Sequence, residues 1–177
     1  MSLLQTVAPQ QAEGQVAKVY GEIEQVMGFV PNAMQLYSGS PSLLQNRWQN
    51  IGFYMQHPTL SFPLLAMVRM LVSQENDCEY CIGLNEAMLI NKVGLTPEAV
   101  AATKRNPADA PLDEKDKAML MLVLKATKAP KTVAKADLDG LRALGWKDSE
   151  ILDAVHHGAA NIASDVMFNT FKVSNDF

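Results

Sequence analysis

The sequence predicts an all-α fold, a single-domain bundle of many helices. Apolar residues recur at intervals of three and four along most of the chain, which places them on one face of each successive helix. Prolines at the start and glycines at the end of these segments are typical helix boundaries. No stretch of four or more residues alternates cleanly between apolar and polar types between turn signals, so the sequence offers no strands for a sheet.

The N-terminal part of the chain predicts three helices. The first covers Val16–Met27 and ends at Gly28, a typical helix stop. A short helical segment follows over Asn32–Tyr37. The dipeptide Ser40–Pro41 then supplies an N-cap and a proline in the first turn of a helix that runs over Leu43–Gln56.

The next two helices contain the most apolar and the most reactive residues. Ser61 and Pro63 start a helix through Val72 that is apolar on nearly every side and must therefore be largely buried. A polar patch over Gln74–Asp77 separates it from a helix that opens at a pair of cysteines and ends near Gly94. The cysteines thus lie at the start of a helix.

The rest of the chain predicts four more helices and no second domain. We expect them over Thr96–Arg105, Asp113–Lys128, Asp137–Ala143, and from Asp148 or Ser149 through Met167, with a loop over Asn106–Pro111. Residues 1–177 are expected to form one domain, in which N-terminal helices (1–57) precede a helical core (58–172).

Composition and charge exclude several classes of function. Of the 177 residues, 48% are apolar and 19% charged, and the net charge is −4, so no basic face for nucleic acid or an anionic membrane is expected. The first ten residues lack the basic and apolar regions of an export signal, and no apolar run approaches the roughly 20 residues of a membrane span. We therefore expect a cytoplasmic protein without a membrane segment.

The two cysteines of the chain are Cys78 and Cys81, three positions apart. A disulfide that closes so short a loop constrains the unfolded chain little, so the pair is expected to take part in chemistry rather than to staple the fold. If Cys78 lies at the helix N-cap, the unpaired N–H groups of the first turn favour its thiolate. Cys81 lies one turn further on the same face and can close a reversible disulfide with it.

Four acidic residues surround the cysteines: Glu75, Asp77, Glu79 and Glu86. Negative charges close to a thiol raise its pKa and oppose the effect of the helix terminus. Glu75 either faces the pair and accepts a proton from it, or is solvated with the other acids. The sequence leaves both interpretations open.

The stretch Leu71–Asn85, LVSQENDCEYCIGLN, resembles the alkylhydroperoxidase D-like and carboxymuconolactone decarboxylase family, in particular its peroxidase-related branch. The similarity covers roughly Leu60–Phe171. Later segments that share it are Leu95–Glu98, Leu112–Ala118, Asp137–Gly145 and Glu150–Val155.

The resemblance implies an all-helical fold of the alkylhydroperoxidase D-like type and a homo-oligomer, either a trimer or a dimer of trimers. It also implies a redox pair that reduces a hydroperoxide or disulfide substrate with electrons from a dithiol donor, without cofactor or metal. The roles it implies are attack by Cys81 and disulfide formation by Cys78. The start of the helix instead favours the thiolate of Cys78, which differs from the role that the resemblance implies.

Two positions depart from the pattern of this family. The histidine four residues after the second cysteine is Asn85 here, and the glutamate twelve residues before the first cysteine is Ala66. Asn85 can hydrogen-bond a thiol but cannot take its proton near neutral pH. The replacement bases that we consider are Glu75 and either His156 or His157, which point about 100° apart on a helix, so at most one of the two faces the site.

The predicted function is thiol-dependent reduction of a hydroperoxide or disulfide by Cys78 and Cys81, with Glu75, Asn85 and His156 as further candidate site residues. The alternative is a non-catalytic or redox-sensing helical oligomer with a degenerate site. Zinc binding would need His57, His156 or His157 to complete a half-site of two cysteines, and we do not favour it. The decarboxylase branch of the family does not use such a pair.

Overall fold

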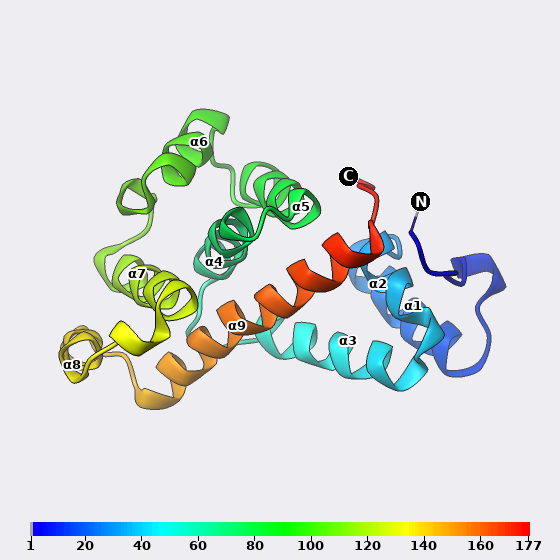
Figure 1. Cartoon of the computed structure of the whole chain (residues 1–177), viewed down its shortest axis with the longest axis horizontal. Coiled ribbons are helices and arrows are strands. Elements are labelled where there is room, and N and C mark those ends of the chain that lie inside the picture. The colour runs from blue at the N-terminus through cyan, green and yellow to red at the C-terminus, as the bar shows by residue number, and fades with distance from the viewer. Residues whose placement is uncertain (1) are drawn as a thin grey trace. The chain divides into compact units, whose positions relative to one another are not determined.

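The computed structural model describes residues 2–177, and within this range it contains only helices, turns and loops. The predicted all-α fold class is confirmed (Figure 1). The α-helices are α1 (Gly14–Met27), α2 (Asn32–Gln35), α3 (Pro41–Met55), α4 (Phe62–Glu75), α5 (Glu79–Asn91), α6 (Pro97–Arg105), α7 (Glu114–Lys128), α8 (Lys135–Ala143) and α9 (Asp148–Phe171). Short 3-10 helices occupy Pro9–Gln11, Leu36–Gly39, Pro107–Asp109 and Pro130–Thr132.

The chain forms two compact units. One consists of the residues up to Gln56 together with Met167–Asp176, and the other of His57–Val166 with Phe177. Both cysteines lie in the second unit. The expectation that residues 1–177 form a single domain stays a prediction.

The first unit contains α1 to α3 and the last turn of α9. Gly28 follows α1 with φ 84°, a left-handed conformation that glycine adopts without strain, as the sequence predicted for a helix stop. Ser40 is the N-cap residue of α3 and Pro41 lies in its first turn, as predicted, but the Ser40 side chain makes no capping hydrogen bond. A backbone φ of −134° and ψ of 86° place Ser40 outside the usual N-cap conformation.

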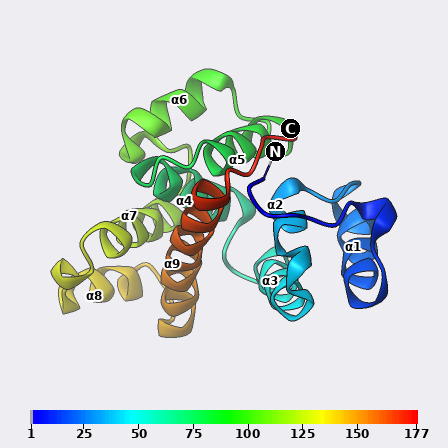
Figure 2. The ribbon, with the colours of Figure 1, turned by 45° about the vertical axis from the view of Figure 1, so that its right-hand side comes forward.

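Helix α4 is the central helix of the second unit and lies next to α5 and α7 (Figures 1 and 2). Its N-terminus is fixed as predicted: the Ser61 hydroxyl accepts a hydrogen bond from the N–H of Leu64 at 3.2 Å, and Pro63 lies in the first turn. Its buried side chains cover most of its circumference; they are Leu64, Leu65, Ala66, Met67, Val68, Met70, Leu71, Val72 and Ser73.

A tight turn joins α4 to α5 and sets the position of the first cysteine. Asp77 adopts a left-handed backbone with φ 51°, which aspartate tolerates better than most residues. The N–H of Cys78 donates to the carbonyl oxygen of Ser73 at 3.0 Å, so the chain reverses within a few residues. Cys78 becomes the N-cap residue of α5, and the cysteines open this helix as the sequence predicted.

No helix among residues 2–177 combines the length and the apolar character needed to cross a membrane. Helix α4, most of whose apolar side chains are buried within the protein, is 14 residues long.

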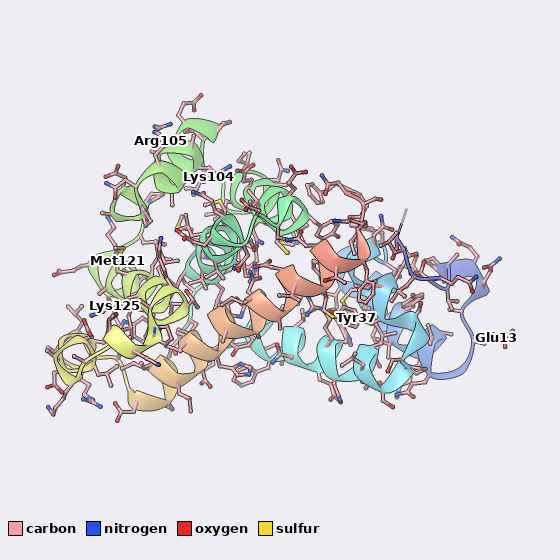
Figure 3. All side chains as sticks on the ribbon, viewed as in Figure 1. Glu13, Tyr37, Lys104, Arg105, Met121 and Lys125 are labelled. Carbon is pink, nitrogen blue, oxygen red and sulfur yellow. The ribbon has the colours of Figure 1, made fainter. Side chains whose placement is uncertain are left out.

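Two methionines of α7 provide a matched test of this packing. Met119 is fully buried, whereas Met121, labelled in Figure 3, is 43% exposed. We expect Met119→Ala to lower the free energy of unfolding by about 2–5 kcal/mol, because it leaves a cavity in the core. Met121→Ala should change it by less than about 0.5 kcal/mol. Urea denaturation measures both values, and equal losses would contradict the described packing.

Candidate functional site

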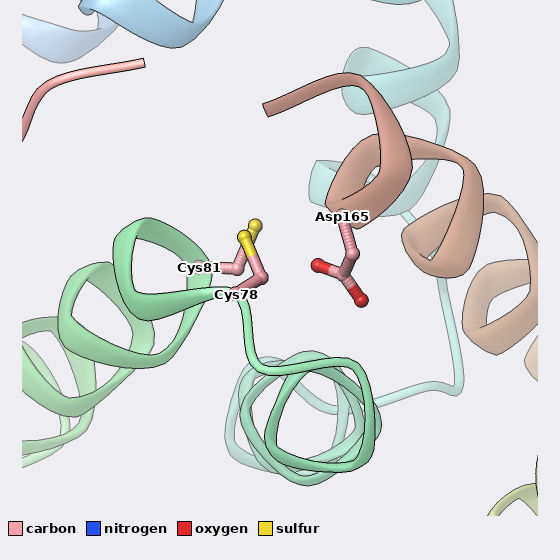
Figure 4. A group of neighbouring side chains, drawn as sticks. All are labelled: Cys78, Cys81 and Asp165. Carbon is pink, nitrogen blue, oxygen red and sulfur yellow. The ribbon is translucent and has the colours of Figure 1, made fainter. Parts of the chain in front are cut away.

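Two buried thiols and a buried carboxyl group lie close together within the second unit. Cys78 is the N-cap of α5, Cys81 lies one turn further, and Asp165 projects from α9. The two sulfurs and a carboxylate oxygen all lie within 4.8 Å of one another. Figure 4 shows the sulfurs side by side with the carboxylate next to them. Cys78 and Asp165 are fully buried, and Cys81 is 5% exposed.

Neutral hydrogen-bond donors hold the carboxylate of Asp165 in place. Its Oδ1 accepts from the hydroxyl of Ser73 at 2.8 Å, and its Oδ2 accepts from the Nδ2 of Asn76 at 3.3 Å. The Nδ2 of Asn161 lies 3.4 and 3.2 Å from the two oxygens and also donates to the Oγ of Ser73 at 2.8 Å. Within the described part of the chain, Asp165 forms no ion pair.

Burial without a cationic partner changes the acidity of Asp165. Desolvation raises the pKa of its carboxyl above the ordinary value, and its interactions with Cys81 and Ser73 offset only part of this effect. The group is therefore easier to protonate than a surface carboxylate, and it touches both thiols. An acid with these properties can exchange a proton with the cysteines.

The two cysteines are free thiols, and a hydrogen bond between them shifts their pKa values in opposite directions. The S–H of Cys81 donates to the sulfur of Cys78, which lowers the pKa of Cys78; the backbone N–H of Cys81 acts in the same direction. The same hydrogen bond, together with burial, raises the pKa of Cys81. When the pair carries one negative charge, that charge resides on Cys78, as the helix-terminus argument indicated.

Asn85 is fixed beside the backbone of Cys81 rather than beside its sulfur. Its Nδ2 donates to the carbonyl oxygen of Cys81 at 2.7 Å, and its Oδ1 accepts from the Nε of Arg69 at 2.7 Å. Ala66 is fully buried in α4, so the position at which the resemblance implies a glutamate carries no polar group. The proton relay of the family is absent at both positions.

Glu75 lies away from the cysteines. Its carboxylate pairs with the ammonium group of Lys128 at 2.8 Å, and both side chains are more than half exposed. It does not belong to the cluster of Cys78, Cys81 and Asp165. The position of Glu75 therefore supports the interpretation of a solvated acid.

The two histidines of α9 have different environments. His156 is exposed, whereas His157 is 8% exposed and its Nε2 lies 3.2 Å from the Nη1 of Arg69. Because arginine can only donate, the Nε2 of His157 accepts this hydrogen bond. Burial, and secondly the charge of Arg69, lower the pKa of His157 to about 3, so it is neutral at physiological pH. Neither histidine belongs to the cluster around the cysteines.

Sequence reasoning missed Asp165, although the sequence contained a signal for it. His157, Asn161 and Asp165 recur at intervals of four and are all buried, so they form a polar stripe on the inner face of an otherwise apolar helix. Buried polar side chains in such a stripe must hydrogen-bond one another or a partner helix. Here they face α4, through Arg69 and Ser73.

Cys78, Cys81 and Asp165 also form a group of three possible metal ligands. Zinc in structural sites takes four ligands in tetrahedral geometry, and the histidines that the sequence offered as further ligands do not lie in this group. The three residues would bind such an ion only with a fourth ligand from solvent or from another molecule. Proton exchange between the thiols and the carboxylate needs no such fourth ligand.

Three solved structures are similar to this chain over nearly its whole length. The uncharacterised peroxidase-related protein from Ralstonia eutropha JMP134, described as an alkylhydroperoxidase AhpD core, is 23% identical with a TM-score of 0.86, and the match covers 99% of this chain and 92% of that chain. The peroxidase-related protein from Silicibacter sp. TM1040 is 22% identical with a TM-score of 0.84 and the same coverage, 99% and 92%. The debrominase Bmp8, as a cysteine-to-alanine variant in complex with 2,3,4-tribromopyrrole, is 19% identical with a TM-score of 0.71, and the match covers 99% and 94%.

No protein-family model and no curated protein sequence matches the chain. The three structures establish the architecture: this chain has the fold of the alkylhydroperoxidase AhpD core. The resemblance that the sequence indicated is confirmed for the fold.

The two adjacent histidines of α9 give a pH test of the site. Because the pKa of His157 falls from the ordinary 6.5 to about 3 on folding, the unfolded chain binds a proton that the folded protein excludes. His157 therefore contributes stability above about pH 6.5, and this contribution decreases by about 1.4 kcal/mol per pH unit as the pH falls toward 3. In His157→Gln this part of the pH dependence should disappear.

The control is His156→Gln, the same substitution at the exposed neighbour. Urea denaturation at several values between about pH 4 and pH 7 measures the slope for each variant. The account requires a shallower slope for His157→Gln alone, and equal slopes in both variants would contradict the neutral state of His157.

Proposed function

We propose that the protein is a thiol-dependent hydroperoxide reductase in which Cys81 attacks the peroxide, Cys78 closes the disulfide, and Asp165 moves the protons. The observation that carries this proposal is the meeting of two free sulfurs and a carboxylate without a cationic partner within 4.8 Å. The small exposed fraction of Cys81, 5% against 0% for Cys78, favours Cys81 as the sulfur that meets a substrate.

In the first step, the proton of Cys81 moves to the thiolate of Cys78. The Cys81 thiolate then attacks the terminal oxygen of the hydroperoxide and breaks the O–O bond. Cys81 becomes a sulfenic acid, and the alkoxide that leaves takes a proton from Asp165 to give the alcohol. Protonation of the leaving group is a task for a carboxyl with a raised pKa, because burial makes such a group hold its proton to a higher pH than a surface carboxyl does.

In the second step, the Asp165 carboxylate takes the proton of Cys78. The Cys78 thiolate attacks the sulfur of the Cys81 sulfenic acid and forms the disulfide, and the departing hydroxide takes the proton now held by Asp165 and leaves as water. Two thiols and one hydroperoxide thus give one disulfide, one alcohol and one water. A dithiol donor then reduces the disulfide by thiol–disulfide exchange.

Asp165 takes the place of the relay that Asn85 and Ala66 cannot provide. It contacts both thiols, and Ser73 and Asn161 fix the orientation of its carboxylate. The same group acts as an acid in the first step, where the alkoxide needs a proton, and as a base in the second, where Cys78 must lose one.

A second candidate is reductive removal of bromine from an aromatic ring, which the likeness to the debrominase Bmp8 in complex with a brominated pyrrole favours. Two thiols would again supply two electrons, with loss of bromide, gain of a proton by the ring carbon and formation of the disulfide. Release of bromide from 2,3,4-tribromopyrrole by the reduced protein, without consumption of hydroperoxide, would select this function instead.

Stopped-flow mixing of the reduced protein with an organic hydroperoxide tests the roles of the cysteines. We expect loss of two thiols per peroxide at a rate at least about a hundredfold above that of a free thiol, and no reaction in Cys81→Ser. Cys78→Ser should react once and stop at the sulfenic acid, which a dimedone adduct identifies by mass spectrometry. A rate equal to that of free cysteine would exclude a peroxidase and favour a redox-sensing or structural role for the pair.

A matched pair of acidic residues tests the proton-transfer role. Asp165→Asn removes the ionisable group from the cluster, and we expect the oxidation rate to fall by about a hundredfold. Glu75→Gln alters an exposed carboxylate that pairs with Lys128, so it should react like the wild type. A fast Asp165→Asn variant, or an equally slow Glu75→Gln variant, would contradict the assignment.

A further inference from the structure

A second charged side chain lies beside the site without an acidic partner. The guanidinium of Arg69, from the middle of α4, donates through its Nε to the Oδ1 of Asn85 at 2.7 Å and through its Nη1 to the Nε2 of His157 at 3.2 Å. Its Nη2 lies 4.0 Å from the sulfur of Met88. Among residues 2–177 no carboxylate forms an ion pair with it.

The positive charge of Arg69 persists at neutral pH. Burial lowers the pKa of Arg69 to about 10, which still leaves the group protonated. All three of its partners are neutral, since His157 does not protonate until about pH 3. A partly buried cation loses hydration that no neighbouring anion replaces, so we expect this charge to serve an anion that forms nearby.

Of the two cysteines, Cys81 is the one whose charge raises the pKa of Arg69, against the larger effect of burial. Asn85 connects the two residues, because it accepts from Arg69 and donates to the carbonyl oxygen of Cys81 at 2.7 Å. The guanidinium therefore keeps a fixed position relative to the turn that carries Cys81. Cys78, by contrast, is stabilised as a thiolate by the start of α5 and by the S–H of Cys81.

We propose that Arg69 is the positioning residue that makes Cys81, rather than Cys78, the attacking sulfur. As the shared proton moves from Cys81 to Cys78, the negative charge moves toward the guanidinium and away from the start of α5. The full charge of Arg69 compensates for the loss of the helix terminus, whose effect is that of about half a charge. This inference rests on the proposed redox function and explains why the less acidic cysteine can be the one that reacts.

Three other ionisable groups near the pair do not make this selection. Asp165 contacts both sulfurs, so its charge raises the pKa of each. His157 is neutral, and Glu86 on α5 pairs with Lys104. Of these groups, Arg69 is the one that distinguishes Cys81 from Cys78.

Single-hit alkylation with iodoacetamide tests the proposal without any peroxide. The reduced protein is treated with a small fraction of one equivalent, and fragmentation of the peptide that contains both cysteines shows which sulfur carries the label. Cys78 carries the charge at rest, but Cys81 is the more exposed sulfur and becomes the thiolate when its proton moves to Cys78, so we expect the wild type to be labelled mainly at Cys81. Arg69→Met and Arg69→Gln should shift the ratio of Cys81 to Cys78 label by about tenfold toward Cys78 and move the alkylation of Cys81 to higher pH, because an opposite charge is lost.

Two control variants separate charge from packing. Arg69→Lys retains the charge and should keep most of the label on Cys81, and Arg105→Met, at an exposed arginine labelled in Figure 3, should label like the wild type. Unchanged label in folded Arg69→Met or Arg69→Gln would overturn the proposal, as would equal behaviour of Arg69→Lys and the neutral variants. If the protein reduces peroxide but the label does not shift in the neutral Arg69 variants, the proposed function stands and the role of Arg69 is wrong. If the label shifts but the protein does not reduce peroxide, the role of Arg69 stands and the proposed function is wrong.

Discussion

The contact between a buried carboxylate and two thiols is the constraint on which the rest of the site depends. Asp165 is fully buried with only neutral donors around it, so its carboxyl group binds a proton more readily than it would in water. Each proton that leaves one group must go to another within the cluster or to a bound substrate. The chemistry proposed for the protein follows from this exchange.

Side chains of α4 hold Asp165 of α9 in place at that contact. Ser73 ends the buried part of α4, orients the carboxylate with its hydroxyl and accepts the N–H of Cys78 with its carbonyl oxygen. One residue therefore fixes both Asp165 and the start of α5. About one turn earlier in the same helix, Arg69 places a cation on the side of Cys81. Helix α4 therefore supplies both the hydroxyl that orients the carboxylate and the charge next to Cys81.

Helix boundaries and the position of the cysteines could be predicted from the sequence because their causes are local. Ser61 with Pro63, and Gly28, act within a few residues of themselves, and Cys78 follows a turn that its neighbours define. Asp165 could not be assigned in this way, because its partners come from α4 and α5, far away along the chain. The choice between His156 and His157 likewise depends on which face of α9 is buried, and the structure selects His157 as the inner residue.

Infrared difference spectroscopy of the reduced and the oxidised protein tests the central claim most directly, because it detects the protonation of a single carboxyl group. If Asp165 exchanges protons with the thiols, disulfide formation should change the carbonyl stretch of a protonated carboxylic acid. The change should be absent in Asp165→Asn and present in Glu75→Gln. A spectrum without a carboxylic acid signal, or one that persists in Asp165→Asn, would contradict the account.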